Sequence, residues 1–365
     1  MSETTLLLIG GLVLLVLGGE FLVRGASKLA VSLGISPLVV GLTVVAFGTS
    51  APELAVSVQA AWGGHADLAL GNVVGSNIFN VLFILGISAL IVPLVVDAQI
   101  IRQEMPIMIG ASLLLVGLSL DGGISRIEGI GMFGLVLAYT TALVIQSRRS
   151  TKALQTEYEG EIHSAPRKDA EKGWDDRLVV QIVLLVVGLA VLVLGSRWLV
   201  QGATAVATAL GVSQLVIGLT IVSAGTSMPE VAASIIAALR GQRDIAVGNV
   251  VGSNIFNILC VVGFSAIVSP TEMAVPSVML AFDMPVMVAV AVACLPLFFT
   301  GHMISRFEGA VFLGYYVAYT TYLVLASQAH ALLDSYSLMM RAIVLPLTGL
   351  TIAIVAFRAY RARAR

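Results

Sequence analysis

The chain has 365 residues, of which 58% are hydrophobic and only 11% are charged, and its net charge is −1. Soluble domains carry about 25% charged residues, and the mean hydropathy of +1.00 also indicates that lipid surrounds most of this chain. The balanced charge argues against a nucleic-acid binder. Cys260 and Cys294 both lie in apolar runs, so we expect buried free thiols rather than a disulfide framework.

Eleven segments have the roughly 20 apolar residues that a membrane-spanning helix needs. They are 4–30, 35–62, 67–92, 98–120, 124–146, 178–200, 212–239, 244–268, 276–299, 303–327 and 338–358. The first has no basic region before it and no convincing cleavage site, which favours a membrane helix over a signal peptide. The stretch 147–177 is polar with charges of both signs, and we predict a solvated, partly mobile loop there.

That loop separates two similar halves. GNVVGSNIFN occurs at 71–80 and again at 248–257, a spacing of 177 positions (248 − 71), and 41–86 matches 218–263 without a gap at 28 of 46 positions. Further pairs are EMP and DMP at 104 and 283, ISRIEG and ISRFEG at 124 and 304, and AYTT at 138 and 318. We therefore predict five-helix repeats over 1–146 and 178–327, with 338–358 as an additional helix that has no partner.

The two halves are expected to face opposite sides of the membrane, because consecutive copies of an odd number of helices insert with opposite orientation. The basic residues support this. Arg24 and Lys28 of the first copy are replaced by Gln201 and Ala205 in the second. Conversely, Gly63 and Ala66 of the first copy are replaced by Arg240 and Arg243. With the N-terminus outside, 17 of the 20 Lys and Arg lie in cytoplasmic segments, which include 147–177 and the C-terminus. The predicted fold is an all-α, multi-pass inner (plasma) membrane protein.

Each repeat contains a sequence that is unsuited to a lipid-facing helix, AFGTSAPE at 46–53 and SAGTSMPE at 223–230. Pro52 and Pro229 lack an N–H group and break the helix, which frees carbonyl groups that must find a partner at membrane depth. Glu53 and Glu230 lie near the middle of their spans, where a charged side chain costs about 2.5–3.5 kcal/mol or more. Equivalent points of inverted halves should meet near the midplane, and a cation is the natural partner of two such carboxylates.

The repeated string begins the third segment of each half. Ser76 and Asn80 share one helix face, as their four-residue spacing requires, and Ser253 and Asn257 repeat the arrangement. Gly71 and Gly75 are four residues apart, as are Gly248 and Gly252, and this spacing permits close helix packing. Asn72 and Asn249 could cap the helix start; for these two and for Asn77 and Asn254, a role in helix packing is the preferred interpretation. Asn80 and Asn257 are instead assigned to the cation site.

Carboxylate, hydroxyl, amide and carbonyl oxygens suit hard cations such as Ca²⁺, which takes six to eight oxygen ligands. Nothing selects zinc or copper, because there is no cluster of His or Cys. All four histidines (His65, His163, His302 and His330) fall in or beside predicted loops.

With these motifs the chain resembles the calcium/cation antiporter superfamily, and within it the prokaryotic sodium/calcium exchangers, over about four-fifths of its length. The resemblance implies ten helices in two inverted repeats and Ca²⁺ export driven by Na⁺ through alternating access. It implies ligands from the side chains of Thr49, Ser50, Glu53, Ser76, Asn80, Thr226, Ser227, Glu230, Ser253 and Asn257, and from the carbonyls of Ala46 and Ser223. Many exchangers have Asp where this chain has Asn257, which leaves ion stoichiometry and the driving ion open.

Three alternatives remain at this point. A Ca²⁺/H⁺ antiporter would use Glu53 and Glu230 as proton carriers, whereas a channel would not need two alternately gated halves. An intramembrane hydrolase would need a catalytic motif, and neither H-E-x-x-H, G-x-S-x-G nor a P-loop Lys occurs. We expect no enzyme activity, no cofactor and no obligate protein partner; Mn²⁺, Cd²⁺ and Mg²⁺ stay open as further substrates.

Overall fold

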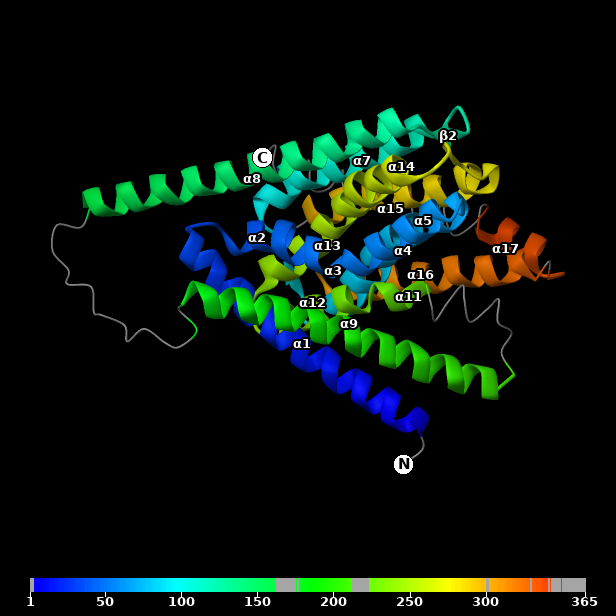
Figure 1. Cartoon of the computed structure of the whole chain (residues 1–365), viewed down its shortest axis with the longest axis horizontal. Coiled ribbons are helices and arrows are strands. Elements are labelled where there is room, and N and C mark those ends of the chain that lie inside the picture. The colour runs from blue at the N-terminus through cyan, green and yellow to red at the C-terminus, as the bar shows by residue number, and fades with distance from the viewer. Residues whose placement is uncertain are drawn as a thin grey trace.

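The computed structural model describes residues 3–161, 175, 177–211, 223–299, 302–328 and 330–340, together with 342 and 349. The described chain is built almost entirely of helices, and its strands are two residues long (Figure 1). This confirms the predicted all-α class.

The first half consists of two long helices that flank three interrupted ones. Its elements are α1 (Glu3–Leu33), α2 (Pro37–Val40), η1 (Gly41–Val45), α3 (Ala46–Thr49), α4 (Ala51–Trp62), α5 (Ala66–Phe79), η2 (Asn80–Leu85), α6 (Gly86–Ile91), β1 (Leu94–Val95), η3 (Ile100–Glu104), α7 (Met105–Leu118), β2 (Gly123–Ile124) and α8 (Arg126–Glu161). The elements labelled η are π-helical turns, which are rare and often mark functional sites.

The second half repeats this order wherever both copies are described. Its elements are α9 (Leu178–Ala209), α11 (Ser223–Thr226), α12 (Met228–Leu239), α13 (Arg243–Phe256), η6 (Asn257–Val262), α14 (Gly263–Val268), β3 (Met273–Ala274), η7 (Met279–Asp283), α15 (Met284–Phe299), β4 (Met303–Ile304) and α16 (Arg306–Ser327). A short helix, α17 (Leu333–Met339), follows.

Eight of the described helices are long and apolar enough to cross a membrane, and the bent helix pair Pro37–Thr49 and Ala51–Trp62 makes a ninth candidate. The predicted segment 212–239 is described only from residue 223, and most of 338–358 lies outside the described residues. The predicted count of eleven therefore stays a prediction.

The region predicted as a loop, 147–177, is helical in its first part. Helix α8 continues past residue 146 as far as Glu161. The sequence from Ser147 to Glu159 contains no Gly or Pro, and eight of its 13 residues are Arg, Lys, Ala, Leu, Gln or Glu, all good helix formers. The candidate membrane span in this helix runs from Arg126 to Ser150, so it extends into the predicted loop, because polar residues do not prevent a helix from continuing.

Helices α1 and α9 run antiparallel along one side of the molecule (Figure 1) and approach each other at glycines. A Cβ atom on Gly11 would lie 2.9 Å from the Gly195 carbonyl oxygen, and one on Gly18 would lie 2.9 Å from that of Gly188. Since Gly188 and Gly195 are the repeat equivalents of Gly11 and Gly18, the two contacts are exchanged by a two-fold operation. This is the geometry that inverted repeats require.

Two short ribbons join the halves. Strand β1 pairs antiparallel with β4, with Leu94 opposite Ile304, and β2 pairs with β3, with Ile124 opposite Met273. Each ribbon takes one strand from each half, so the two ribbons are equivalent as well.

The third segment of each half forms the centre of the protein. In the most apolar 18-residue stretches of Ala66–Ile91 and Arg243–Val268, 72% and 89% of residues are buried inside the protein, against 44% or less in the other spans. Close packing of α13 depends on its glycines, because a Cβ atom on Gly252 would lie 2.5 Å from the Leu42 carbonyl oxygen. The predicted packing role is confirmed for Gly248 and Gly252 but not for their equivalent Gly71, where a Cβ atom would meet only the Met279 methyl group, at 3.7 Å.

Candidate functional site

The break in each second segment positions a glutamate. Between α3 and α4 the helix bends by 45° at Ser50, which leaves helical geometry with φ −79° and ψ 4°. Ser227 does the same between α11 and α12, with φ −89° and ψ 8°. Pro52 and Pro229 occupy the first turn of the following helix, where a missing N–H is tolerated. Glu53 and Glu230 therefore lie in that same first turn.

Both glutamates are buried, with 0% and 1% of their surface exposed, and each is held by the opposite half. The Ser227 hydroxyl donates a hydrogen bond of 2.8 Å to Glu53 Oε1, and the Ser50 hydroxyl donates one of 3.2 Å to Glu230 Oε1. Because these contacts exchange under the repeat, the two carboxylates lie on either side of one symmetric centre.

The repeated string supplies the other side of this centre. Ser76, Asn80, Ser253 and Asn257 are all buried, and the Ser227 hydroxyl lies 3.2 Å from the Ser76 hydroxyl. Asn80 and Asn257 begin the π-helical turns η2 and η6. The structure thus places Ser76 beside Ser227 and Glu53, residues that are far apart in the sequence but were predicted to share one site.

Five buried oxygen atoms of the predicted ligands have no hydrogen-bond partner among the described residues. They are Glu53 Oε2, Glu230 Oε2, Asn80 Oδ1, Asn257 Oδ1 and Ser253 Oγ. An unpartnered buried carboxylate oxygen is costly, and four of these atoms form two symmetric pairs. All are the type of ligand that hard cations prefer.

The remaining predicted ligands have different surroundings. The Thr49 hydroxyl lies 3.1 and 3.3 Å from the carbonyl oxygens of Val45 and Ala46, and 3.0 Å from Asn249 Oδ1. Its equivalent, Thr226, lies 3.4 Å from Asn72 Oδ1.

The two predicted carbonyl ligands, those of Ala46 and Ser223, belong to helices α3 and α11. The Ala46 carbonyl also accepts a bond from the Ser50 backbone N–H at 3.0 Å, so the helix break does not leave it without a partner. Ser223 begins α11, and its side chain lies outside the described residues.

Asn72 and Asn249 do not cap helices, because α5 begins at Ala66 and α13 at Arg243, several residues earlier. Instead, the Asn72 amide donates to the Glu53 carbonyl at 3.2 Å and to the Ser57 hydroxyl at 2.9 Å. Asn249 does the same for the Glu230 carbonyl and Ser234, at 3.4 and 2.9 Å. The preferred interpretation, a role in helix packing, is confirmed, because each side chain joins two neighbouring helices. These asparagines hold the backbone of each glutamate in place; Ser57 and Ser234 were not found from the sequence, although both recur 177 positions apart.

None of the ion pairs between described residues involves Glu53 or Glu230. Among the described residues, the ion pairs are those of Arg24 and Lys28 with Asp175 and of Arg240 with Glu20. Nor do the described residues contain a group of three or more His, Cys, Asp or Glu that could hold a metal. The site therefore has two carboxylates and otherwise neutral oxygen atoms.

A second pair of acidic residues has a different role. Glu104 is buried and accepts bonds from the Tyr139 hydroxyl at 2.6 Å and the Gln99 amide at 3.0 Å. The equivalent Asp283 accepts one from Tyr319 at 2.8 Å. These contacts explain why the EMP and DMP motifs recur together with AYTT: each acid is satisfied by a tyrosine of the same half.

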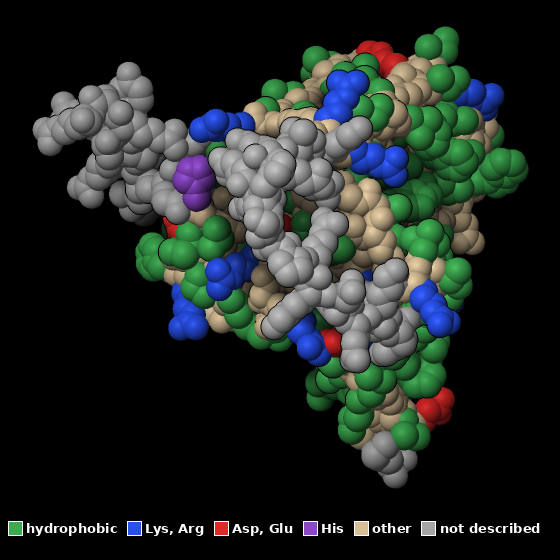
Figure 2. Space-filling view, turned by 90° about the vertical axis from the view of Figure 1, so that its left-hand side faces the viewer, with side chains coloured by type: hydrophobic (Ala, Val, Ile, Leu, Met, Phe, Trp, Pro, Cys, Tyr) green, Lys and Arg blue, Asp and Glu red, His purple; other side chains and the backbone are tan. Residues whose placement is uncertain are grey.

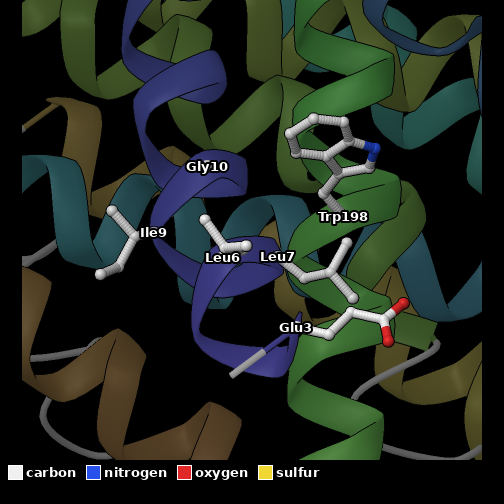
Figure 3. Close-up of a pocket in the computed structure, with 6 residues that line it drawn as sticks. All are labelled: Glu3, Leu6, Leu7, Ile9, Gly10 and Trp198. Atoms are coloured by element: carbon white, nitrogen blue, oxygen red, sulfur yellow. The ribbon is translucent and has the colours of Figure 1, made fainter. Parts of the chain in front are cut away.

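A cavity of about 380 Å³ lies between α1 and α9 (Figure 3). Its lining is Glu3, Leu6, Leu7, Ile9, Gly10 and Trp198. The lining is almost wholly apolar and includes none of the predicted ligands, so this cavity is a groove in the outer surface rather than part of the cation site.

Comparison with known proteins agrees with this geometry. The family model described as sodium/calcium exchanger protein matches residues 3–145 and 180–325. The chain is 39% identical to the inner membrane protein YrbG of Escherichia coli, over 74% of this chain and 82% of that protein. It is 35% identical to the sodium/calcium exchanger MaX1 of Methanosarcina acetivorans, over 86% and 96%. The solved structure of the sodium-calcium exchanger NCX_Mj soaked with Na⁺ and Ca²⁺ matches with a TM-score of 0.71 and 29% identity, over 86% of this chain and 96% of that one.

Proposed function

Because the chain belongs to the sodium/calcium exchanger protein family, a family of secondary transporters rather than enzymes, we propose that it exports Ca²⁺ in exchange for Na⁺ through one site at Glu53 and Glu230. The observation that carries this proposal is the pair of buried carboxylates, each of which has one oxygen without a protein partner. One Ca²⁺ or two Na⁺ would balance their two negative charges.

The proposed ligands are grouped around these carboxylates. Glu53, Asn80, Glu230, Asn257 and Ser253 contribute the unpartnered oxygens. Ser50, Ser76 and Ser227 are hydrogen-bonded to this group or to one another, and a serine oxygen still has lone pairs for a cation. Thr49, Thr226 and the carbonyls of Ala46 and Ser223 complete the proposed set.

Alternating access is supported by the division of the site between the two halves. Each carboxylate belongs to one half and is hydrogen-bonded by a serine of the other, so relative movement of the halves would open the site to one side at a time. Two equivalent halves that share one site suit a carrier better than a channel.

Na⁺ is favoured over H⁺ as the driving ion by the neutral oxygens of the site. A proton needs only a carboxylate, whereas Na⁺ needs several oxygen ligands around it. The alternative, a Ca²⁺/H⁺ antiporter in which Glu53 and Glu230 carry protons, is separated from this proposal by the experiment below.

We propose an inner-membrane location, with the N-terminus outside and the 147–177 region and C-terminus in the cytoplasm. Figure 2 shows Lys and Arg side chains around the end of the molecule that is on the left in Figure 1. Basic residues mark the cytoplasmic side of membrane proteins. The C-terminal end of α8 lies at the same end (Figure 1).

The test is ⁴⁵Ca²⁺ uptake into Na⁺-loaded vesicles that contain the purified chain. Uptake should require an outward Na⁺ gradient and should not be driven by a pH gradient alone. Uptake driven equally well by protons would support the Ca²⁺/H⁺ alternative, and uptake that needs no counter-ion would support a channel. Vesicles with Glu53→Gln protein serve as the inactive control.

A further inference from the structure

Four asparagines from the repeated strings form a closed hydrogen-bond network between the halves. The Asn257 amide donates to Asn77 Oδ1 at 3.1 Å, and the Asn80 amide donates to Asn254 Oδ1 at 2.9 Å. Asn77 and Asn254 in turn donate to each other's backbone carbonyl oxygens, at 3.3 and 3.4 Å. All four side chains are at least 98% buried.

The orientation of Asn77 is determined by its neighbours. Its amide nitrogen faces two acceptors, the Asn254 carbonyl at 3.3 Å and the Met287 sulfur at 3.7 Å. A flipped amide would place its oxygen against both acceptors, which is unfavourable because neither can donate. Asn254 is fixed in the same way by the Asn77 carbonyl and by Met108.

The orientation of Asn77 and Asn254 determines the orientation of the amides that are bonded to them, Asn257 and Asn80. Since Asn77 can offer only its oxygen to Asn257, Asn257 must present its nitrogen there. Its own oxygen is then left without a protein partner. The same reasoning applies to Asn254 and Asn80. An amide free to rotate would present its nitrogen to the site part of the time, and a positively polarised N–H repels a cation.

From this we infer that Asn77 and Asn254 are positioning residues, which hold the amide oxygens of Asn257 and Asn80 toward the cation from across the interface between the halves. The inference rests on the proposed function of the site. It replaces a role in helix packing alone for Asn77 and Asn254, and it pairs each positioning residue with a ligand of the opposite half.

The test is a double-mutant cycle on the full-length protein, with ⁴⁵Ca²⁺ binding and the KM and Vmax of Na⁺-driven uptake as measurements. Asn77→Leu should weaken Ca²⁺ binding about three- to tenfold, the effect of one buried hydrogen bond, and should raise KM while Vmax changes little. In an Asn257→Ala background, Asn77→Leu should have no further effect on binding. In an Asn80→Ala background its effect should persist, because the Asn77 side chain is bonded to Asn257 and not to Asn80.

Asn254→Leu should show the mirror pattern, with its effect lost in Asn80→Ala and kept in Asn257→Ala. If Asn77→Leu does not elute as folded protein, Asn77→Ser, whose side chain is too short to reach Asn257, is used in the same cycle. Equal losses in all backgrounds, or unchanged binding, would overturn the inference while the proposed function stands. Wild-type protein that binds no Ca²⁺ would overturn both.

Discussion

The Ser227 hydroxyl donates a 2.8 Å hydrogen bond to the Glu53 carboxylate, although the two residues are 174 positions apart. Its repeat equivalent joins Ser50 to Glu230 at 3.2 Å. Each carboxylate is thus oriented by a residue at the helix break of the other half. A change at one break therefore alters the ligands contributed by both halves.

The carboxylates of Glu53 and Glu230 should both be needed for Ca²⁺ binding. Glu53→Gln and Glu230→Gln each keep the side-chain shape and remove one charge. Either change should reduce Ca²⁺ affinity by at least about thirtyfold, because truncating one side of a buried charge pair costs roughly 2–5 kcal/mol. Both variants should still insert, since a neutral residue is cheaper in the membrane. Glu3→Gln, at an exposed position at the start of α1, should transport normally; near-normal transport by either site variant would contradict a shared site.

Inverted topology can be tested by labelling. Gly64 and Gly241 have φ values of +79° and +74°, so a cysteine there would be strained, and their neighbours are better positions. In a background without Cys260 and Cys294, His65→Cys and Gln242→Cys should react with an impermeant thiol reagent from opposite sides of the membrane. Labelling of both from the same side would rule out inverted repeats.

Asn257→Asp would add a third negative charge to the site and should favour one more monovalent ion per cycle. We expect a higher Na⁺ Hill slope and a stronger response of Ca²⁺ flux to membrane potential than in wild type. Because Asp cannot donate to Asn77 Oδ1, the Asn77 amide should have to turn, so the variant should also melt at a lower temperature. The measurements are flux in vesicles clamped at several potentials and thermal unfolding. Identical voltage dependence in both proteins would show that residue 257 does not set the stoichiometry.

The glycines between α1 and α9 should tolerate no added methyl group. A Cβ atom on Gly18 would lie 2.7 Å from the Leu192 backbone nitrogen, so Gly18→Ala should force the helices apart and destabilise the protein by about 1–3 kcal/mol. Gly134→Ala in α8 is the matched control, because its Cβ atom would meet no atom within 4 Å. Equal melting temperatures for the two variants would contradict close packing at Gly18.

Asp175, which lies just before α9, forms ion pairs with Arg24 and Lys28 of α1. The hydrogen bond from Arg24, aided by the charge of Lys28, lowers the pKa of the Asp175 carboxyl. A pKa that is lower in the folded protein means that this contact stabilises above the ordinary Asp value of about 3.9 and is lost as the pH falls through the lowered value. Asp175→Asn should therefore reduce the melting temperature at pH 7. Below about pH 4, the melting temperature of this variant should decrease less with falling pH than that of the wild type. Asp334→Asn, in α17, should change neither.

Much of this protein follows from its sequence. Hydropathy places the spans and the identical strings reveal the repeat. The paired glutamates beside helix-breaking prolines locate the centre. Each of these signals is a local pattern in the chain or a string that recurs in it, so none requires knowledge of which residues meet. Tertiary structure decided the rest: that Ser50 and Ser227 orient the glutamate of the opposite half, that Asn72 and Asn249 hold the glutamate backbone instead of capping a helix, and that Asn77 and Asn254 turn the amides of Asn257 and Asn80. These roles depend on which polar groups meet when the two halves pack together, with no water to satisfy them, and spacing along one half cannot specify a partner in the other.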